Sequence, residues 1–180
     1  MDYVNDTGLP SVTDILNCYI DTRWFKKEHT DRGTGAHDFL ACYALGIPHI
    51  PKIWNPLWNS YVESGREWFD RNIKDVLMVE ERLQIDGLYT GKLDMVAILS
   101  DKRTALVDWK TSQATAKTWK GQTAAYQNLV QENAGIDIDV RVSVRLRSEF
   151  QKRALDNYYT DFQKDLNNFN GAFIAYSAYM

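Results

Sequence analysis

The spacing of apolar residues changes near Val76, and this change limits the folds open to the chain. Upstream, apolar residues recur at steps of three and four, as on one face of a helix. Downstream come short runs rich in β-branched residues, separated by turn residues such as Asp86-Gly87 and Ser100-Asp101. Such runs predict consecutive strands joined by tight connections. We expect these strands at residues 76–83, 91–100 and 105–109.

A helix, a strand and a second helix are predicted after these three strands. The first helix covers about 117–133 and ends at Gly135. From Ile138 to Arg147 apolar and polar residues alternate, which is typical of a strand with one buried and one polar face. From Ala154 to Tyr176 apolar residues recur at steps of four and three. This spacing predicts a long amphipathic helix at the C-terminus.

Helices also dominate the part of the chain before Val76. The first begins at the N-cap Ser11, with Asp14 completing a capping box. Its buried side is expected to hold Ile15, Leu16, Tyr19 and Ile20. A second helix should run from about Arg32 to Ala44, and a third from about Val62 to Asp75. The order of elements predicts an α/β (α+β) fold, in which a mixed central sheet is flanked by helices.

The length of 180 residues suits one domain with a sizeable core, and the chain has no internal repeat or linker-like stretch. We therefore expect a single domain over residues 1–180. Its parts are a helical portion over about 1–75, a sheet core over about 76–150 and a C-terminal helix over about 151–180.

Composition excludes several classes of protein. The formal net charge is −3, so the chain does not resemble a basic protein that coats DNA by attraction alone. Two cysteines, Cys18 and Cys42, are too few for a disulfide framework or a four-cysteine metal site. No apolar run approaches the roughly 20 residues that span a bilayer. The start of the chain, Met1 to Asp6, is polar and acidic, unlike a signal peptide, and predicts a cytoplasmic protein.

Acidic residues and one lysine gather on the predicted strands. Glu80, with Glu81 beside it, lies on the first strand, and Asp94 and Asp108 lie on the next two. Lys110 follows Asp108 after one residue, and side chains two apart on a strand point to the same face. If the second and third strands pair as a hairpin, the carboxylates of Asp94 and Asp108 lie near each other.

This set of side chains suits the hydrolysis of phosphodiesters. Carboxylate oxygens are the preferred ligands of Mg²⁺. A bound metal ion polarises the phosphoryl group and stabilises the leaving oxygen. A lysine beside it orients or deprotonates the attacking water and offsets the charge that builds on the phosphoryl oxygens. The backbone carbonyl of Trp109 is a further candidate ligand.

Each half of the pattern also has an ordinary structural interpretation. An Asp-x-Lys at a strand end is often a solvated edge, and the sequence from Gly91 to Asp94 could be a turn. Both carboxylates, however, are embedded in core-forming runs such as 95–99, where an unpaired carboxylate is costly. Glu81 remains an alternative to Glu80, because a register error of one residue exchanges the two faces of a strand.

Five short motifs in order resemble those of the RecB-type branch of the PD-(D/E)XK nucleases. They are Val79-Glu80-Glu81-Arg82-Leu83, Gly91-Lys92-Leu93-Asp94, Val107-Asp108-Trp109-Lys110-Thr111-Ser112, Gln122-Thr123-Ala124-Ala125-Tyr126 and, upstream, Arg32-Gly33-Thr34-Gly35-Ala36-His37. The segment from Pro10 to Leu16 is similar to the opening of phage members. The likeness extends from Leu9 to about Leu146 and implies a restriction-endonuclease-like core.

The resemblance implies roles for individual residues. Asp94 and Asp108 would be the central metal ligands, Glu80 an outer carboxylate and Lys110 the catalytic lysine. His37 would complete the metal shell, although a lone helical histidine is also often structural. The metal would be one or two ions of Mg²⁺ or Mn²⁺. Many relatives carry an iron–sulfur cluster on four cysteines, and with two cysteines we expect no iron–sulfur cluster here.

Gln122 and Tyr126 would brace the active site or contact DNA, since they are four apart on one helix face. A core stripe is the alternative for this pair.

A basic patch is a candidate for contact with DNA phosphates. Arg141 and Arg145 share the polar face of the alternating strand, and Lys117 and Lys120 open the helix before it. Together they would give a salt-sensitive attraction without sequence choice. An ordinary solvated face is the alternative for each charge. Trp54, Trp58 and Trp119 are candidates for stacking on unpaired bases, with core packing as the alternative.

We therefore predict a Mg²⁺- or Mn²⁺-dependent deoxyribonuclease, an exonuclease in phage DNA recombination, replication or repair. The alternative is a catalytically silent module of the same fold that binds DNA or a protein. The expected partners are single- or double-stranded DNA and a recombinase, helicase or single-strand-binding protein, with an oligomer also open. A phage-encoded protein would act in the cytoplasm of its bacterial host.

Overall fold

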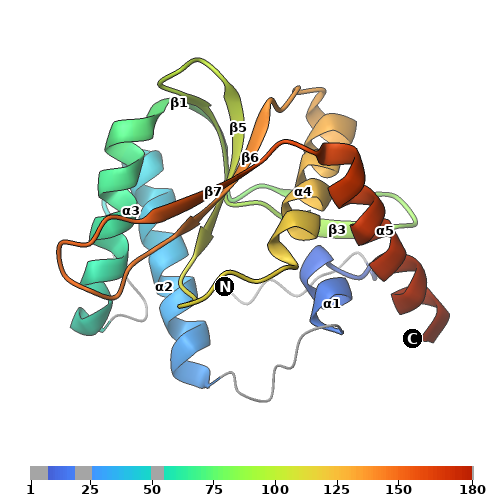
Figure 1. The fold of residues 1–180 in the computed structure, drawn as a ribbon, viewed down its shortest axis with the longest axis horizontal. Coiled ribbons are helices and arrows are strands. Elements are labelled where there is room, and N and C mark those ends of the chain that lie inside the picture. The colour runs from blue at the N-terminus through green and yellow to red at the C-terminus, as the bar shows by residue number, and fades with distance from the viewer. Residues whose placement is uncertain (1–7, 19–25, 50–54, 180) are drawn as a thin grey trace.

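A five-stranded mixed sheet with helices on both faces forms the centre of the protein in a computed structural model, which describes residues 8–18, 26–49 and 55–179 (Figure 1). The helices are α1 (Val12–Asn17), α2 (Lys27–Ala44), the 3₁₀ turn η2 (Pro56–Trp58), α3 (Asn59–Asn72), α4 (Trp119–Ala134) and α5 (Phe162–Tyr179). The strands are β1 (Ile73–Val79), β2 (Arg82–Ile85), β3 (Tyr89–Lys92), β4 (Met95–Leu99), β5 (Thr104–Lys110), β6 (Val140–Arg145) and β7 (Leu155–Tyr159). The strand order β1-β4-β5-β6-β7 confirms the mixed sheet flanked by helices.

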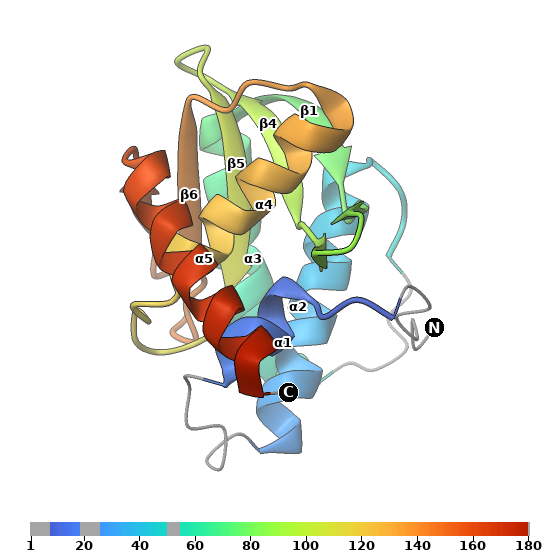
Figure 2. The ribbon, with the colours of Figure 1, turned by 90° about the vertical axis from the view of Figure 1, so that its right-hand side faces the viewer.

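The sheet separates two apolar clusters, because successive side chains of its strands point to opposite faces. On one face α2 and α3 pack against Met95 and Val107. On the other face α1, α4 and α5 pack against Val96 and Leu106, the residues next in sequence. The two views of the ribbon show this division, with the sheet running between the two groups of helices (Figures 1 and 2). Both faces of the central strands are therefore buried.

The predicted N-terminal signals are confirmed where the structure describes them. The hydroxyl of Ser11 accepts a hydrogen bond from the Asp14 backbone, and the Asp14 carboxylate accepts one from the Ser11 backbone, which completes the capping box. Tyr19 and Ile20 of the expected buried stripe, and Met1 to Asp6, lie outside the described residues. The second helix begins five residues earlier than expected, at Lys27, and passes through Gly33 and Gly35 rather than starting beside them.

The three predicted consecutive strands are in fact five, because two of the runs are broken. Glu80 has a φ of 55°, a left-handed conformation that ends β1, and the second run is interrupted at Asp94 between β3 and β4. The two breaks are bonded to each other: Glu80 N donates to the Asp94 carbonyl at 2.9 Å, and Leu93 N donates to the Glu81 carbonyl at 3.0 Å. The result is one long hairpin that bends at Glu80 and Asp94.

β5 and β6 are parallel, and α4 is the crossover that joins them. The helix ends as predicted at Gly135, whose φ of 62° is the left-handed conformation that glycine adopts readily. The expectation of a polar, solvent-facing side for the alternating strand is wrong. Arg141 and Ser143 are buried, because α4 and α5 cover the second face of β6.

The predicted C-terminal helix begins later than expected. Residues 155–159 form β7, which pairs antiparallel with β6, and α5 starts only at Phe162. The apolar spacing of Leu155 and Tyr159 fits a helix, but the backbone of this segment hydrogen-bonds to the free edge of β6 instead. Within the described residues, none of the helices combines the length and apolarity needed to cross a membrane. The single domain over 1–180 stays a prediction.

Candidate active site

The bend in the long hairpin brings two acidic side chains together. Glu80 and Asp94 lie at the two breaks that are bonded to each other, and their carboxylates face α2. Glu80 also forms an ion pair with Lys92 of β3. Glu81, the alternative ligand, is exposed and takes no part in this group. A non-glycine residue in the left-handed region is strained, and such strain collects at functional sites.

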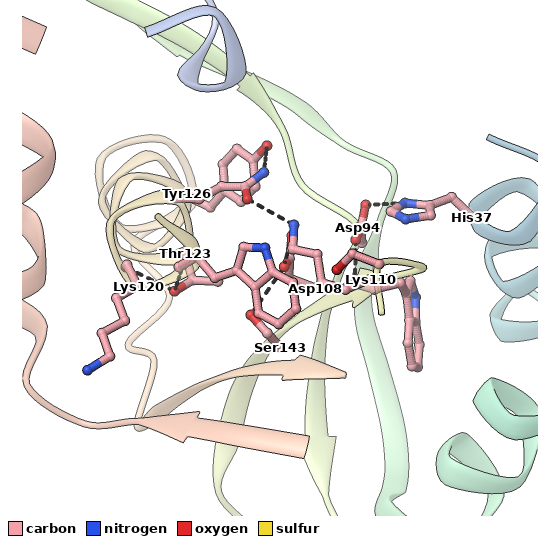
Figure 3. A network of polar contacts seen from close by, with 12 residues as sticks. His37, Asp94, Asp108, Lys110, Lys120, Thr123, Tyr126 and Ser143 are labelled. Carbon is pink, nitrogen blue, oxygen red and sulfur yellow. Dashed lines mark hydrogen bonds and ion pairs between the residues drawn. The ribbon is translucent and has the colours of Figure 1, made fainter. Parts of the chain in front are cut away.

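Asp94 is held in place from two sides. Its Oδ1 lies 3.0 Å from Nδ1 of His37 on α2, and its Oδ2 accepts a hydrogen bond from the Trp109 backbone N–H at 2.7 Å. N–H and carbonyl of one strand residue point to the same edge, so the Trp109 carbonyl also faces the edge beside Asp94. Figure 3 shows Asp94 and His37 facing each other beside the end of β5.

Asp108 and Lys110 project from the same face of β5, as their spacing predicts. The Lys110 ammonium lies 2.9 Å from Oδ1 and 2.8 Å from Oδ2 of Asp108, and Ser143 of the parallel neighbour β6 donates to Oδ2 at 3.3 Å. The Asp108 side chain is only 3% exposed and that of Lys110 14%. Both charges are thus withdrawn from bulk water. Their mutual attraction is stronger in the protein interior than it would be in water.

Gln122 and Tyr126 of α4 brace the lysine. Gln122 Oε1 accepts a hydrogen bond from Lys110 at 2.8 Å, while its Nε2 donates to the Tyr126 hydroxyl at 3.2 Å. The chain Tyr126–Gln122–Lys110–Asp108 runs from the helix into the sheet (Figure 3). Gly91 is needed beside it, because a Cβ there would lie 2.8 Å from the Tyr126 ring and from Leu129.

Three residues form a group suited to a metal ion. One ligand atom each from His37, Glu80 and Asp94 lie within 4.8 Å of one another, and Asp108 is outside this group because it is turned toward Lys110. The donor set of carboxylates and an imidazole fits a divalent cation such as Mn²⁺ or Mg²⁺. A cleft of about 280 Å³ exposes the same three residues, with Gly33 and Lys92 among its walls.

The charges around this group displace the pKa values of its members. Burial alone would lower the pKa of His37, but the charge and hydrogen bond of Asp94 and the charge of Glu80 outweigh it and raise the pKa to about 9. Burial raises the pKa of Glu80, and the charge of Asp94 adds to the rise. His37 is therefore protonated at neutral pH and carries a proton where a cation would be held.

The two aspartates are displaced in opposite directions. Burial alone would raise the pKa of Asp94, but the charge and hydrogen bond of His37, the charge of Lys110 and the Trp109 N–H hold it below its usual value. Burial raises the pKa of Asp108. The charge of Lys110 offsets part of this rise, and the charge of Asp94 adds to it, so the pKa stays above its usual value. Such a separation of two neighbouring carboxylates is common at catalytic sites.

The predicted basic patch is not assembled. Arg141 is 1% exposed and its Nη2 lies 2.9 Å from Asp165 of α5, so it binds a carboxylate inside the protein and is not available to DNA. Lys117 and Lys120 are exposed at the start of α4, and Lys120 points away from Lys110 (Figure 3). Arg145 is half-buried and donates to the Gln113 carbonyl. The alternation of β6 predicted a shared face but not the helices that cover it.

The tryptophans that the structure describes pack in the core, which was the alternative to stacking on bases. Trp58 and Trp119 are buried in the core, at 4% and 6% exposure, and are not placed to stack on bases. Trp54 lies outside the described residues. Sequence reasoning also missed Lys92 and Ser143, which contact Glu80 and Asp108. The position of Lys92 inside the motif of Asp94 was a usable signal, whereas Ser143 depends on the parallel register of β5 and β6.

The chain belongs to the PD-(D/E)XK nuclease superfamily, whose profile matches residues 8–167. The mixed sheet flanked by helices is the restriction-endonuclease-like fold. Members of this superfamily are typically nucleases that use divalent metal ions and have DNA as substrate, and the membership indicates the same class of activity here.

Other comparisons add little to this assignment. No curated protein matches the sequence. Among solved structures, the "Crystal structure of SSO0001" aligns over 91% of this chain and 84% of that chain, with 12% sequence identity and a TM-score of 0.37. A likeness at that score is too weak to indicate function.

Proposed function

We propose that the protein is a metal-dependent deoxyribonuclease that hydrolyses phosphodiester bonds at the bend of the long hairpin. One observation carries the proposal. A group of His37, Glu80 and Asp94 that is suited to a cation lies beside a buried Asp108–Lys110 pair, on the adjoining strand β5. A metal-binding group next to a lysine that is held in place suits the hydrolysis of a phosphodiester.

The metal ion would be held by Asp94, His37 and Glu80, with the Trp109 carbonyl and Asp108 as further oxygen donors near it. When bound, Mg²⁺ or Mn²⁺ supplies Lewis-acid polarisation of the phosphate and stabilisation of the leaving oxygen. His37 must give up its proton before it can bind a metal ion, and Asp94 remains ionised because its pKa is held low.

Lys110 has the central role among the protein's own groups. It is fixed between Asp108 and Gln122, so its ammonium is directed without the loss of freedom that a long side chain normally incurs. From there it orients the attacking water and donates to a phosphoryl oxygen as negative charge builds up. Water adds to phosphorus, the bond to the leaving oxygen breaks, and the products are a phosphomonoester and a hydroxyl end.

The finer assignment depends on the sequence motifs. The order of the five motifs supports a RecB-type enzyme of phage origin, and with it an exonuclease that works in recombination, replication or repair beside a recombinase, helicase or single-strand-binding protein. Processive exonucleases act at ends, so sparing of closed circles is the property to test.

The test compares linear and covalently closed circular DNA, single- and double-stranded, in Mg²⁺, Mn²⁺ or EDTA. Lys110→Ala and Asp108→Ala remove the proposed machinery. Lys74→Ala is the matched control, because Lys74 is an exposed lysine of β1 at the end of the sheet away from Asp94. Circular dichroism and thermal melting establish that each variant is folded.

We expect cleavage by the wild type and by Lys74→Ala only when metal is present, and a loss of at least about a hundredfold in Lys110→Ala and Asp108→Ala. Sparing of the circles would support an exonuclease, and cutting of the circles an endonuclease. Equal cleavage by wild type and Lys110→Ala would contradict the proposal, as would the absence of cleavage in every metal and substrate.

A further inference from the structure

A cavity of about 520 Å³ lies beside the candidate active site, between the start of α2 and the loop that follows β5. It is lined by His29, Thr30, Arg32, Thr111, Ser112 and Gln113. None of these lining residues is acidic, although the whole chain carries 24 acidic residues against 21 lysines and arginines. The lining of the cavity therefore combines one arginine with three hydroxyl side chains and has no carboxylate, in a protein of net negative charge.

Arg32 is the charged side chain of this cavity, and it is fixed in position. Its guanidinium lies over the Tyr61 ring, 4.9 Å from the centroid, and its Nη2 donates to the Thr111 carbonyl at 3.3 Å. Its Nε is buried and has no hydrogen-bond partner among the residues that the structure describes. A buried donor without an acceptor is costly and calls for an explanation, and an acceptor oxygen on a ligand would provide one.

A second arginine holds the same loop from the other side. Arg145 of β6 donates from Nη1 to the Gln113 carbonyl, and its Nε is likewise buried without a partner in the described part of the chain. The loop at 111–113 follows directly after Lys110. Two guanidinium groups thus flank the segment that leads away from the proposed catalytic lysine.

The cavity and the metal group lie along the same helix. Arg32 precedes His37 by five residues, which is about 7.5 Å along the axis of α2 at 1.5 Å per residue. Gly33, between the two positions, packs against Thr111, since a Cβ there would lie 3.6 Å from its Oγ1. The cavity therefore lies next to the metal group along α2.

We propose that Arg32, supported by Tyr61 and the loop at 111–113, forms a phosphate subsite for the DNA strand next to the bond that is cut. This inference rests on the proposed nuclease function. A guanidinium presents a rigid fork of donors that matches two phosphate oxygens. The phosphate is either an internal phosphodiester or the phosphomonoester at a strand end, since both present the same oxygens.

The experiment measures DNA binding by fluorescence anisotropy in EDTA, where no cleavage occurs. The ligands are one labelled duplex with a 5′ phosphate, the same duplex with a 3′ phosphate or with neither, and a closed circle used as competitor. Arg32→Gln removes the charge, and Arg32→Lys keeps it without the fork. Arg103→Gln is the matched control, because Arg103 is exposed in the turn between β4 and β5, at the far end of that hairpin from Asp94.

We expect Arg32→Gln to bind about tenfold to a hundredfold more weakly than the wild type. The slope of log affinity against log salt should become shallower by about 0.9, the value for one lost phosphate contact. Arg32→Lys should keep the slope and lose part of the affinity, and Arg103→Gln should keep both. A merely structural role of Arg32 would alter the melting temperature but not the salt slope.

The ligands separate the two sources of phosphate. A loss confined to one end-phosphorylated duplex assigns the subsite to a strand end, and an equal loss for all duplexes and the circle assigns it to an internal phosphate. Unchanged affinity and slope in Arg32→Gln overturn the subsite even if the wild type cuts DNA. Arg32-dependent binding without cleavage in Mg²⁺ or Mn²⁺ overturns the nuclease and keeps the subsite, and no DNA binding by the wild type overturns both.

Discussion

Lowering the pH should weaken the binding of a metal ion at the His37, Glu80 and Asp94 group, through the proton on His37. The pKa of His37 is raised from 6.5 to about 9, so a metal ion must displace a proton at any pH below that value. The displacement costs about 1.36 kcal/mol for each pH unit below the pKa. Affinity for Mn²⁺ should therefore fall about tenfold per unit, or about a hundredfold from about pH 8 to pH 6.

The metal-free protein should respond to pH in the opposite direction. Because the folded pKa of His37 lies above its unfolded value, the His37–Asp94 pair stabilises the fold fully below about pH 6.5, and this contribution disappears as the pH rises through about 9. The shift from 6.5 to about 9 corresponds to about 3 kcal/mol in the free energy of unfolding. His37→Gln should remove most of both pH dependences, because glutamine has no proton to exchange.

Isothermal titration calorimetry with Mn²⁺, in buffers of different ionisation enthalpy, measures both the affinity and the protons released. We expect release of about one proton per metal ion near neutral pH in the wild type and much less in His37→Gln. Urea denaturation in EDTA over the same pH range gives the stability. Equal Mn²⁺ affinity at both ends of the range, or an equal pH slope in His37→Gln, would refute the assignment of His37 to the metal group.

Three further predictions concern the surroundings of the site. Asp165→Asn should lower the free energy of unfolding by about 3–5 kcal/mol in urea titrations, because it leaves the buried Arg141 cation unpaired, and replacing both residues with apolar ones should recover most of the loss. Gly91→Ala should cost about 1–3 kcal/mol and lower the melting temperature, since its Cβ would lie 2.8 Å from two side chains of α4. A wild-type melting temperature would contradict that packing. Gln122→Ala should reduce kcat by about tenfold and change KM less, because it removes the hydrogen bond that holds the Lys110 ammonium. A change in KM alone would instead indicate that Gln122 contacts DNA.

Local spacing made part of the site predictable. Asp108 and Lys110 are two residues apart on a strand, and Gln122 and Tyr126 are four apart on a helix, so each pair had to share a face. The structure adds that the two pairs meet, with Lys110 and Gln122 in contact. That meeting depends on tertiary packing between β5 and α4, which no local period encodes.

The wrong predictions concern segments whose local sequence pattern does not show which distant elements pack against them. Alternation along β6 indicates that Arg141 and Ser143 share a face, but the helices on that face come from distant segments, and one of them supplies Asp165. Residues 155–159 have a helical period, but pairing with β6 decides their conformation. The sequence around Glu80 does not predict its left-handed backbone, which occurs where the Glu80 N–H bonds to the carbonyl of Asp94, 14 residues away.

The parallel pairing of β5 and β6 has a consequence for how the site is assembled during folding. The hairpin of β4 and β5 is local, and such contacts form quickly. The crossover through α4 covers residues 111–139, and this longer segment must fold back before β6 can pair with β5. Until α4 docks, Lys110 lacks the carbonyl of Gln122, and until β6 arrives, Asp108 lacks the hydroxyl of Ser143. During synthesis the chain therefore contains the hairpin with Asp94 and Asp108 before Lys110 is held in place. Any nuclease activity would then appear only when the fold is nearly complete.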